Sequence, residues 1–354
     1  MASNYLGRNL RLSTFGESHG AAIGGVLDGL PAGIKINADQ LSSALEKRRP
    51  GQSSLSTPRK EGDAFELLSG LFEGITTGAP LAWIIRNKDV RSTDYDNLKN
   101  VLRPSHADAT YLKKYGIRDH RGGGRSSARE TANWVMGGTI AQFIIPEVDC
   151  KAFVDQIGHI RLENPWDSVN LNNIESNPVR CPDAETAVKM VELIEQARDE
   201  GDSLGGAIRC IIQNVPPGLG SPVFGKLQAR LAEALFSLNA VKGLEFGAGF
   251  NAAAMRGSQH NDGWLNDNEM ASNHAGGILG GISNGEPIYF RLAFKPTATI
   301  SKLQLAKTVD GELTELKAQG RHDPCVLPRA VPIVEALSLF VLADLTLDAR
   351  KDQL

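Results

Sequence analysis

"GESHGAAIGGVLDGLPAG" occupies residues 16–33, and "GDSLGGAIRCIIQNVPPG" occupies residues 201–218. Aligned without a gap, the two stretches are identical at seven of 18 positions. Each places an apolar, strand-like run between a glycine-rich start and a turn that contains proline and glycine. The similarity predicts two copies of one unit fused in tandem, with halves at about 10–145 and 200–350 of a single domain over residues 1–354.

A helix signal follows each stretch. Asn37 is placed to cap a helix over 38–48. Ser221 is placed to cap a helix over 222–238, with Pro222 at the first helical position. Chance similarity between two glycine-rich strands is the alternative, and the shared order of elements favours duplication over chance.

Most other candidate strands are short apolar runs, and several are separated only by loops. This order favours antiparallel pairing over a β-α-β series. We therefore expect an α+β fold in which helices cover the sheets. The expected strands are AAIGGVLDGL, AFELLSGLFEG, PLAWIIRN, GGAIRCIIQNV, NAAAMRG and PIYFRLAF. Long helices are expected near 128–144, 184–200, 222–238 and 328–350. Residues 257–285 are expected to form a long functional loop.

Composition narrows the classes of function. The chain has 354 residues, of which 41% are hydrophobic, and this supports a large core and excludes a disordered chain. A net charge of −3 argues against general nucleic-acid binding. The local basic runs EKRRPG, HRGGGRSSAR and GRHDP instead point to a small anionic ligand. The first residues lack the apolar core of a signal peptide, and we find no apolar run long enough to cross a bilayer.

The four cysteines are far apart and include no C-x-x-C pair. Their spacing predicts neither a zinc site nor a disulfide framework, and it fits a reduced, cytoplasmic setting. No two histidines have metal-ligand spacing on one helix, so we expect no metal.

"HRGGGRSSARET" at residues 120–131 combines backbone freedom with positive charge. Ser127 followed by Glu130 predicts a capping box, so the glycines lead into a helix N-terminus, where free N–H groups favour an anion. Arg125 and Arg129 oppose the helix dipole there, and a bound phosphate or carboxylate would remove the conflict. The alternative is that both arginines point to solvent or pair with Glu130. The convergence of glycines and arginines favours the anion site.

Two histidines are candidates for chemistry. His19 is aligned with Leu204 of the second stretch, so packing does not require histidine there, and a chemical role is favoured. His106 lies in a loop between Arg103 and Asp108, and a neighbouring carboxylate would favour its protonated form. Chemical and conformational roles are evenly balanced for His106.

Arg48 and Asp344 each allow two interpretations. Arg48 ends a helix before Pro50, where basic residues are ordinary. Asp344 lies in an otherwise apolar helix, where a carboxylate is costly unless it is paired or exposed. It lies either on the outer face or, if buried, is a functional candidate.

Together these stretches resemble the chorismate synthase family. GESHGAAIGGVLDGLPAG, GGGRSSARETANWVMGGTI and GRHDPCVLPRAVPIVEAL match its three characteristic stretches in order and at similar spacing, and RRPGQS, RPSHAD, NAVKG, SNHAGGILGGIS and KPTAT fit as well. The resemblance covers residue 5 to about residue 348. It implies an anti-1,4-elimination of phosphate and a ring proton from 5-enolpyruvylshikimate 3-phosphate (EPSP). The product is chorismate, and the reaction is the last common step of the shikimate pathway to aromatic amino acids.

The resemblance also implies reduced FMN as a cofactor, although the reaction has no net redox change. It implies a cytoplasmic homotetramer of β-α-β sandwiches with internal pseudo-twofold symmetry. NADPH as an external reductant and a separate flavin reductase are further implied partners, and the sequence does not decide whether the enzyme reduces its own flavin. Ser54 stands where the family often has an arginine, which leaves one substrate or NADPH contact unassigned. The resemblance implies no metal.

The resemblance assigns roles to individual residues. His19 is the acid for the departing phosphate, His106 protonates the reduced flavin, and Asp344 lies near flavin N5 and helps relay the ring proton. Arg48 and Arg129 match arginines that bind substrate. The flavin contacts fall on Arg125, Ser126, Ser127, Asn239, Ala240, Gly280, Lys295, Pro296, Thr297, Ala298, Thr299 and Arg321.

Two other classes of protein would use the same features. A phosphotransferase would use the anion-binding loop, but the chain has no G-x-x-x-x-G-K-[ST] run. An RNA-binding module would use the basic runs, but the acidic net charge and an aromatic content of 6% disfavour it.

Overall fold

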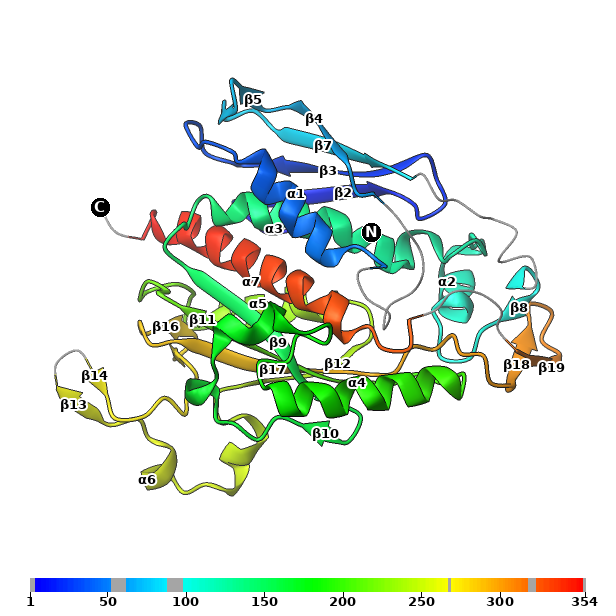
Figure 1. Ribbon diagram of the computed structural model, residues 1–354. Coiled ribbons are helices and arrows are strands. Elements are labelled where there is room, and N and C mark those ends of the chain that lie inside the picture. The colour runs from blue at the N-terminus through cyan, green and yellow to red at the C-terminus, as the bar shows by residue number, and fades with distance from the viewer. Residues whose placement is uncertain (1–3, 52–61, 88–97, 267–268, 318–322, 353–354) are drawn as a thin grey trace.

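The computed structural model describes residues 4–51, 62–87, 98–266, 269–317 and 323–352. Two five-stranded antiparallel sheets enclose a layer of helices, so the fold is α+β, as predicted (Figure 1). The strands of the first sheet follow the order β1 (Tyr5–Leu6), β2 (Arg11–Gly16), β3 (Ala22–Asp28), β7 (Leu81–Arg86) and β4 (Phe65–Ser69). The strands of the second sheet follow the order β10 (Ile160–Arg161), β9 (Asp149–Ile157), β11 (Gly206–Gln213), β17 (Ile288–Phe294) and β12 (Val241–Phe246).

The two similar stretches form the central strands of the two sheets. β3 pairs with β2 and β7, and β11 pairs with β9 and β17. After each central strand come a helix, an edge strand, a hairpin and a returning strand. We propose from this order that the chain is a duplicated unit whose second copy begins at β9 rather than near residue 200. The matching elements are α1 (Ala38–Arg48), β4, β5 (Leu71–Phe72) with β6 (Ile75–Thr76), and β7, against α5 (Leu227–Phe236), β12, β15 (Ile278–Leu279) with β16 (Ile282–Ser283), and β17.

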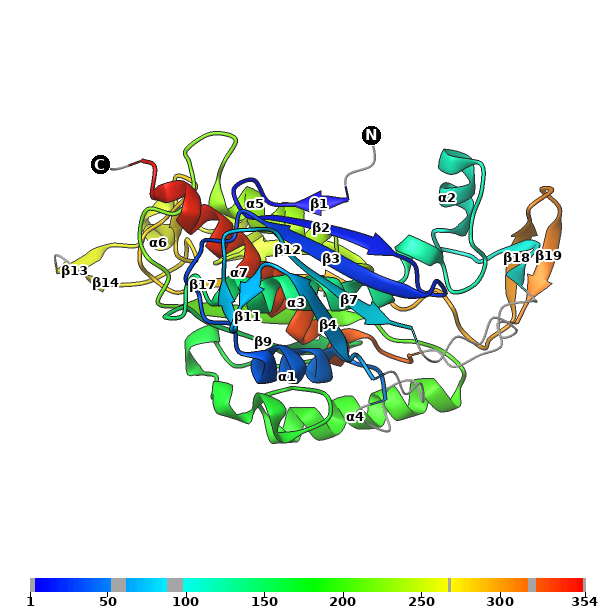
Figure 2. The ribbon, with the colours of Figure 1, turned by 90° about the horizontal axis from the view of Figure 1, so that it is seen from above.

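Helices fill the space between the sheets. α1 and α3 (Thr131–Gln142) lie under the first sheet, α5 and α7 (Leu327–Ala349) lie against the second, and α3 packs on α7 (Figures 1 and 2). The two backbones approach closely at Gly138, where a Cβ atom would lie 2.1 Å from the carbonyl oxygen of Ala336. One apolar core joins both sheets and these helices, and we infer from it a single domain.

α7 is the central helix of this core. By length and composition alone, with a mean hydropathy of 1.9, it is long enough to cross a membrane, so the prediction that no apolar run reaches that length was wrong. In the structure, 83% of the apolar stretch is buried inside the protein. The apolar sequence of α7 is therefore explained by its position between two sheets.

The remaining elements lie outside the sandwich. α4 (Ala184–Asp199), which was predicted, packs on β9 and β10 below the second sheet in Figure 1. A three-stranded sheet lies at one end of the molecule. The other elements are α2 (Asp108–Tyr115), α6 (Gly257–His260), β8 (Val101–Leu102), β13 (Trp264–Asn266), β14 (Glu269–Met270), β18 (Gln304–Thr308) and β19 (Leu313–Leu316).

Helix starts were predicted with mixed success. Asn37 caps α1 as expected, because its side chain accepts the N–H groups of residues 39 and 40. The predicted start at Pro222 was wrong: the N–H of Ser221 donates to the carbonyl of Gly225, which closes a turn, and α5 begins only at Leu227.

Three other local predictions need correction. The first four residues of the run NAAAMRG belong to a 3₁₀-helix over Gly249–Ala254 rather than to a strand, in keeping with the low strand propensity of alanine. Residues 257–285 contain a short helix and two hairpins rather than one long loop. Ser127 caps a 3₁₀ turn before α3, but no capping box forms, because the Glu130 carboxylate bonds to Arg125 and Asn133 instead.

Candidate active site

A cavity of about 420 Å³ lies where α3 and α7 begin and where α1 ends. Its lining comes from segments far apart in the sequence. The N-terminal ends of α3 and α7 both contribute to it, and their dipoles add to its attraction for anions. Of the predicted site residues, the lining contains His19, Arg48, His106, Ser126, Ser127, Arg129, Asn239, Ala240, Lys295, Pro296, Thr297, Ala298 and Thr299.

Three consecutive glycines carry the chain past the two histidines. Gly122, Gly123 and Gly124 have φ values of 70°, 88° and 55°, a backbone conformation that glycine adopts without strain. A Cβ atom on Gly122 would lie 2.3 Å from Cε1 of His19, and one on Gly123 would lie 3.6 Å from Cε1 of His106. A side chain at Gly122 would therefore both clash with the His19 ring and strain the backbone.

His19 sits in the loop between β2 and β3. Its Nδ1 lies 3.2 Å from the Ser18 hydroxyl oxygen. The side-chain amide of Asn87 donates to the carbonyls of Glu17 and Gly20, each at 2.9 Å, and this fixes the loop. The loop at the ends of these two strands thus presents His19 to the cavity.

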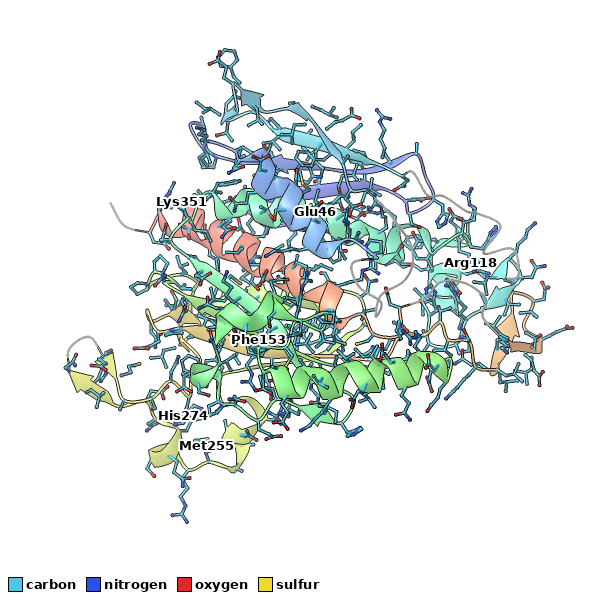
Figure 3. All side chains as sticks on the ribbon, viewed as in Figure 1. Glu46, Arg118, Phe153, Met255, His274 and Lys351 are labelled. Atoms are coloured by element: carbon cyan, nitrogen blue, oxygen red, sulfur yellow. The ribbon has the colours of Figure 1, made fainter. Side chains whose placement is uncertain are left out.

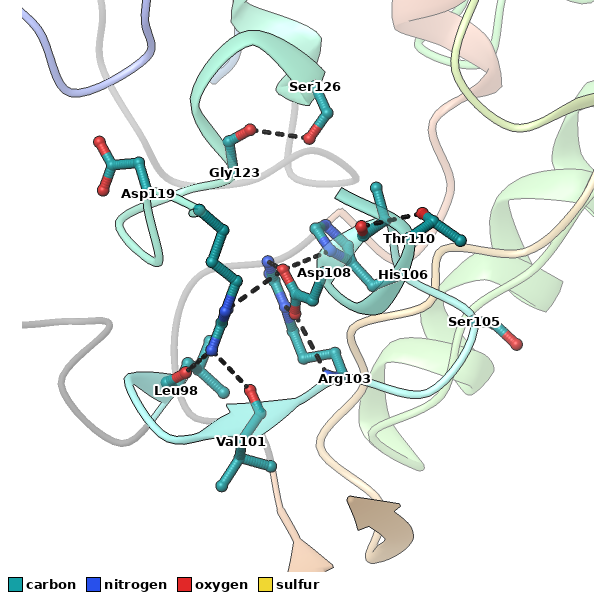
Figure 4. A network of polar contacts seen from close by, with 12 residues as sticks. Leu98, Val101, Arg103, Ser105, His106, Asp108, Thr110, Asp119, Gly123 and Ser126 are labelled. Atoms are coloured by element: carbon teal, nitrogen blue, oxygen red, sulfur yellow. Dashed lines mark hydrogen bonds and ion pairs between the residues drawn. The ribbon is translucent and has the colours of Figure 1, made fainter. Parts of the chain in front are cut away.

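His106 belongs to a network around the buried carboxylate of Asp108 (Figure 4). Asp108 Oδ1 lies 3.0 Å from His106 Nδ1 and 3.4 Å from Nη1 of Arg118. Arg103 donates from Nε to Oδ2 at 2.8 Å and from Nη2 to Oδ1 at 3.0 Å. Burial raises the pKa of Asp108, but the hydrogen bonds and charges of His106 and Arg103 outweigh burial and hold this pKa well below its usual range. Asp108 is therefore ionised.

Asp63 joins the two arginines predicted to bind substrate. Its Oδ2 lies 3.3 Å from Nη1 of Arg48, and its Oδ1 accepts a hydrogen bond from Nη1 of Arg129. Arg48 is only 1% exposed and also donates to the Thr131 hydroxyl at 3.0 Å, so it is not an ordinary basic residue at a helix end. Two guanidinium groups therefore share one carboxylate beside the cavity.

The rest of the lining is also cationic. Asp323 is the only acidic side chain among the described residues of the lining, and it pairs with Arg329. Lys295 adds another positive charge; burial, and then the charge of Lys242, lower its pKa from the usual value. A lining with more cations than anions suits a ligand that carries several anionic groups.

Arg125 does not line the cavity. Its Nη1 donates to a carboxylate oxygen of Glu130 at 2.8 Å, and its Nη2 donates to the Thr14 hydroxyl at 2.9 Å. Burial raises the pKa of Glu130 despite the hydrogen bonds from Thr14 and Arg125. For Arg125, the alternative interpretation of the glycine loop, pairing with Glu130, is the one that the structure supports.

Asp344 does not reach the cavity either. Its carboxylate accepts the backbone N–H groups of residues 8–10 at 2.8–3.2 Å. On α7 the lining ends at Ile333, and 344 − 333 = 11 residues correspond to about 16 Å of helix. Figure 3 labels Lys351, just after α7, and Arg118, beside Asp108, on opposite sides of the molecule. The structure thus assigns Asp344 to anchoring the N-terminal segment.

Two predicted flavin contacts remain. Gly280 is exposed in the turn between β15 and β16, and the next carbonyl, of Gly281, accepts the N–H of Leu227 at the start of α5. The cavity lies beyond the opposite end of α5, at Asn239, so this chain does not bring Gly280 to it. Arg321 lies outside the described residues.

Comparisons with known proteins agree on one family. The family model for chorismate synthase matches residues 10–347. A chorismate synthase of Christiangramia forsetii is 52% identical over 354 residues, which cover 100% of both chains. The chain belongs to the chorismate synthase family. A relative from Parabacteroides distasonis is 53% identical and covers 96% of this chain and 97% of its own. A crystal structure of chorismate synthase matches with a TM-score of 0.77 at 31% identity, covering 97% of this chain and 93% of that chain.

Membership of the chorismate synthase family makes the protein a lyase, as the sequence predicted. Of the carboxylates that organise the cavity, only Asp108 could be picked out from the sequence, as a neighbour of His106. Asp108 was visible two residues after His106, but its contacts to Arg103 and Arg118 were not. Asp323 lies in a segment noted for its basic charge and for its resemblance to the family, but it was not named as a site residue. Asp63 stands just before a strand and belongs to no motif, so its role could not be predicted from the sequence.

Proposed function

We propose that the protein converts EPSP to chorismate, with reduced FMN bound in the same cavity. The observation that carries this proposal is that His19, His106 and the arginine pair bridged by Asp63 border one cavity. EPSP has three anionic groups, a phosphate and two carboxylates, and a site for it needs several cations. The cationic lining meets this need.

Arg48 and Arg129 suit the anionic groups of EPSP, because the planar guanidinium binds carboxylate or phosphate with two parallel hydrogen bonds. Asp63 holds both guanidinium groups in place before the substrate binds, so the two arginine side chains lose little conformational entropy on binding. His19 donates a proton to the phosphate as its C–O bond breaks, which makes phosphate a better leaving group.

Asp323 takes the place of Asp344 as the candidate acceptor of the ring proton. A carboxylate at Asp344 is about 16 Å along α7 from the lining, whereas Asp323 is part of the lining itself. Asp323 forms an ion pair with Arg329, and a carboxylate in this position is a group that can act as a general base.

The residues of the cavity fit FMN. Asn239 donates to the carbonyl of Ser126 at 3.0 Å, and the N–H of Lys295 donates to the carbonyl of Ala240 at 2.9 Å. Three predicted flavin-binding segments thus form one connected wall, with the Lys295 ammonium available to a phosphate. Ser126, Ser127, Asn239, Ala240 and residues 295–299 would hold the cofactor. Bound there in its reduced form, the cofactor would supply an electron transiently, which would ease cleavage of the C–O bond.

An anaerobic assay with chemically reduced FMN and EPSP tests the function. The wild-type protein is expected to form chorismate. His19→Ala is expected to lose about 100-fold or more in turnover at near-native thermal stability, because the leaving group loses its acid. His159→Ala, at an exposed histidine, is the matched control. Unchanged turnover in His19→Ala would remove His19 from the mechanism, and no chorismate from the wild type would contradict the function.

Assembly, reductant and location are further parts of this proposal. We expect a cytoplasmic homotetramer, and sedimentation near four times 38.0 kDa would support it. We also expect that the flavin is reduced externally, by NADPH and a separate flavin reductase. All four cysteines are buried thiols, which is consistent with a reducing compartment.

A further inference from the structure

His106 lines the cavity, and one of its ring nitrogens faces a buried carboxylate. The His106 side chain is 23% exposed, whereas that of Asp108 is 4% exposed, so the ring lies between the cavity and the carboxylate. Nδ1 lies 3.0 Å from Asp108 Oδ1, and the edge with Cε1 and Nε2 lies beside Gly123 (Figure 4). The two nitrogens therefore have different surroundings.

The partners of Asp108 fix it as a hydrogen-bond acceptor. Arg103 donates to both carboxylate oxygens from its side chain and to Oδ2 from its backbone N–H at 3.2 Å. Arg118 adds a positive charge 3.4 Å from Oδ1, and its Nη2 donates to the carbonyls of residues 98, 99 and 101. An acceptor held in this way needs a proton on the His106 nitrogen that it faces.

We propose that Asp108 is a positioning residue that keeps a proton on Nδ1 of His106 and thereby makes Nε2 the atom that exchanges a proton with a ligand in the cavity. A protonated ring gives up the Nε2 proton to an anionic atom of the ligand and becomes neutral, with its remaining proton on Nδ1 facing Asp108. The reverse step returns that proton to Nε2. The effect on turnover rests on the proposed function, but the position of the proton does not.

The Asp108→Asn variant tests the proposal. Asparagine offers one acceptor oxygen in place of the two carboxylate oxygens of Asp108, and each of those two oxygens accepts a hydrogen bond from Arg103. With the oxygen toward Nε of Arg103, the amide NH₂ faces Nδ1 of His106 and donates to it. The neutral ring must then carry its proton on Nε2, so the expected result is a switch of tautomer.

Nitrogen NMR of ¹⁵N-histidine-labelled protein without ligands is the readout. The signals of His106 are assigned by their loss in His106→Gln. The wild-type ring is expected to show a protonated Nδ1 in its neutral form, and Asp108→Asn is expected to show a protonated Nε2. A wild-type ring that is protonated on Nε2, or the same tautomer in both proteins, would overturn the proposal whether or not the protein forms chorismate.

Two further variants show whether a change in the His106 signals comes from a disturbed fold rather than from loss of the Asp108 carboxylate. Asp155→Asn is the matched control, because Asp155 is also a buried carboxylate between two arginines, Arg209 and Arg291, and no described residue places a histidine against it. Arg118→Gln removes one charge beside Asp108 but leaves the carboxylate facing His106. Both are expected to retain the Nδ1 proton, and loss of it in Arg118→Gln would count against the proposal.

The turnover of Asp108→Asn is a second, independent measurement. Asp108→Asn is expected to reduce kcat by at least about tenfold, as when a carboxylate that orients a catalytic imidazole is neutralised, with a smaller change in KM. A switched tautomer with unchanged kcat would contradict the positioning role. A wild type that is inactive but carries the Nδ1 proton would contradict the proposed function and leave the tautomer assignment standing.

Discussion

At the scale of single residues, buried carboxylates determine how the cations of the cavity are placed. Asp63 and Asp108 are each at most 8% exposed, and each contacts at least two positively charged or ring nitrogen groups. A buried charge is tolerated only when it is paired and hydrogen-bonded. These acids therefore hold arginines and a histidine in fixed positions, and the cations in turn line the cavity.

Replacing Asp63 by asparagine is expected to weaken substrate binding. Arg48 and Arg129 would lose their shared partner, repel each other and move apart. We expect KM for EPSP to rise at least about tenfold, a cost typical of disrupting a buried charged pair. Steady-state kinetics measure this change. Glu66→Gln is the control, because Glu66, on nearby β4, forms an exposed ion pair with Arg86 on β7. Equal KM values in the two variants would contradict the role of Asp63.

Asp344 is expected to matter for stability rather than for chemistry. It binds the N–H groups of residues 8–10 and pairs with Arg230 at 2.9 Å. Asp344→Asn should lower the free energy of unfolding by about 3 kcal/mol, because a buried ion pair is broken. Urea denaturation measures this, and Asp348→Asn, at a more exposed position, is the control. A fall in kcat of the folded variant without loss of stability would restore Asp344 to the proton relay.

At the scale of elements, α7 carries a second acid, Glu335, on the side that packs against β9. The Glu335 carboxylate accepts the N–H of Ala152 in β9 at 2.8 Å. Burial raises its pKa from 4.5 to about 7. Its folded state therefore binds a proton more tightly than its unfolded state, and this group costs stability as the pH rises from about 4.5 through 7.

The Glu335→Gln variant is expected to remove this pH dependence. Glutamine keeps an acceptor for the Ala152 N–H but has no charge. At pH 8 the variant should exceed the wild type in free energy of unfolding by roughly 1–3 kcal/mol, and at pH 5 the two should be nearly equal. Denaturation at both pH values measures the difference. A variant that is less stable than the wild type at pH 8 would show that the Glu335 carboxylate is stabilised as an anion.

The elements that could be predicted from the sequence are those with strong local patterns. β3, β11 and β17 are continuous apolar runs, and α1 has a side chain placed to cap it. β9 and β12 were missed, although both lie in the second sheet, because polar residues interrupt them. β9, for example, includes Asp155, which pairs with arginines on β11 and β17. Partners on other strands leave no trace in local sequence.

At the scale of the whole molecule, the cavity joins segments from both halves of the chain. His19 and Arg129 come from the first half, and Lys295 and Asp323 come from the second. The resemblance to the family placed most of these residues in one site, and the structure brings them to one cavity. The pairing of Asp63 with Arg129 spans 66 residues, and that of Asp323 with Arg329 spans only six. Neither has a periodicity that a sequence pattern could reveal.

The cavity is proposed to neutralise a polyanionic substrate beside a flavin. A crystal structure of the protein with FMN and EPSP is the decisive experiment. We predict electron density for both molecules in the cavity, with anionic groups of EPSP on Arg48 and Arg129 and the phosphate of EPSP within hydrogen-bonding distance of His19. Density for EPSP at another surface, with this cavity empty, would contradict the account.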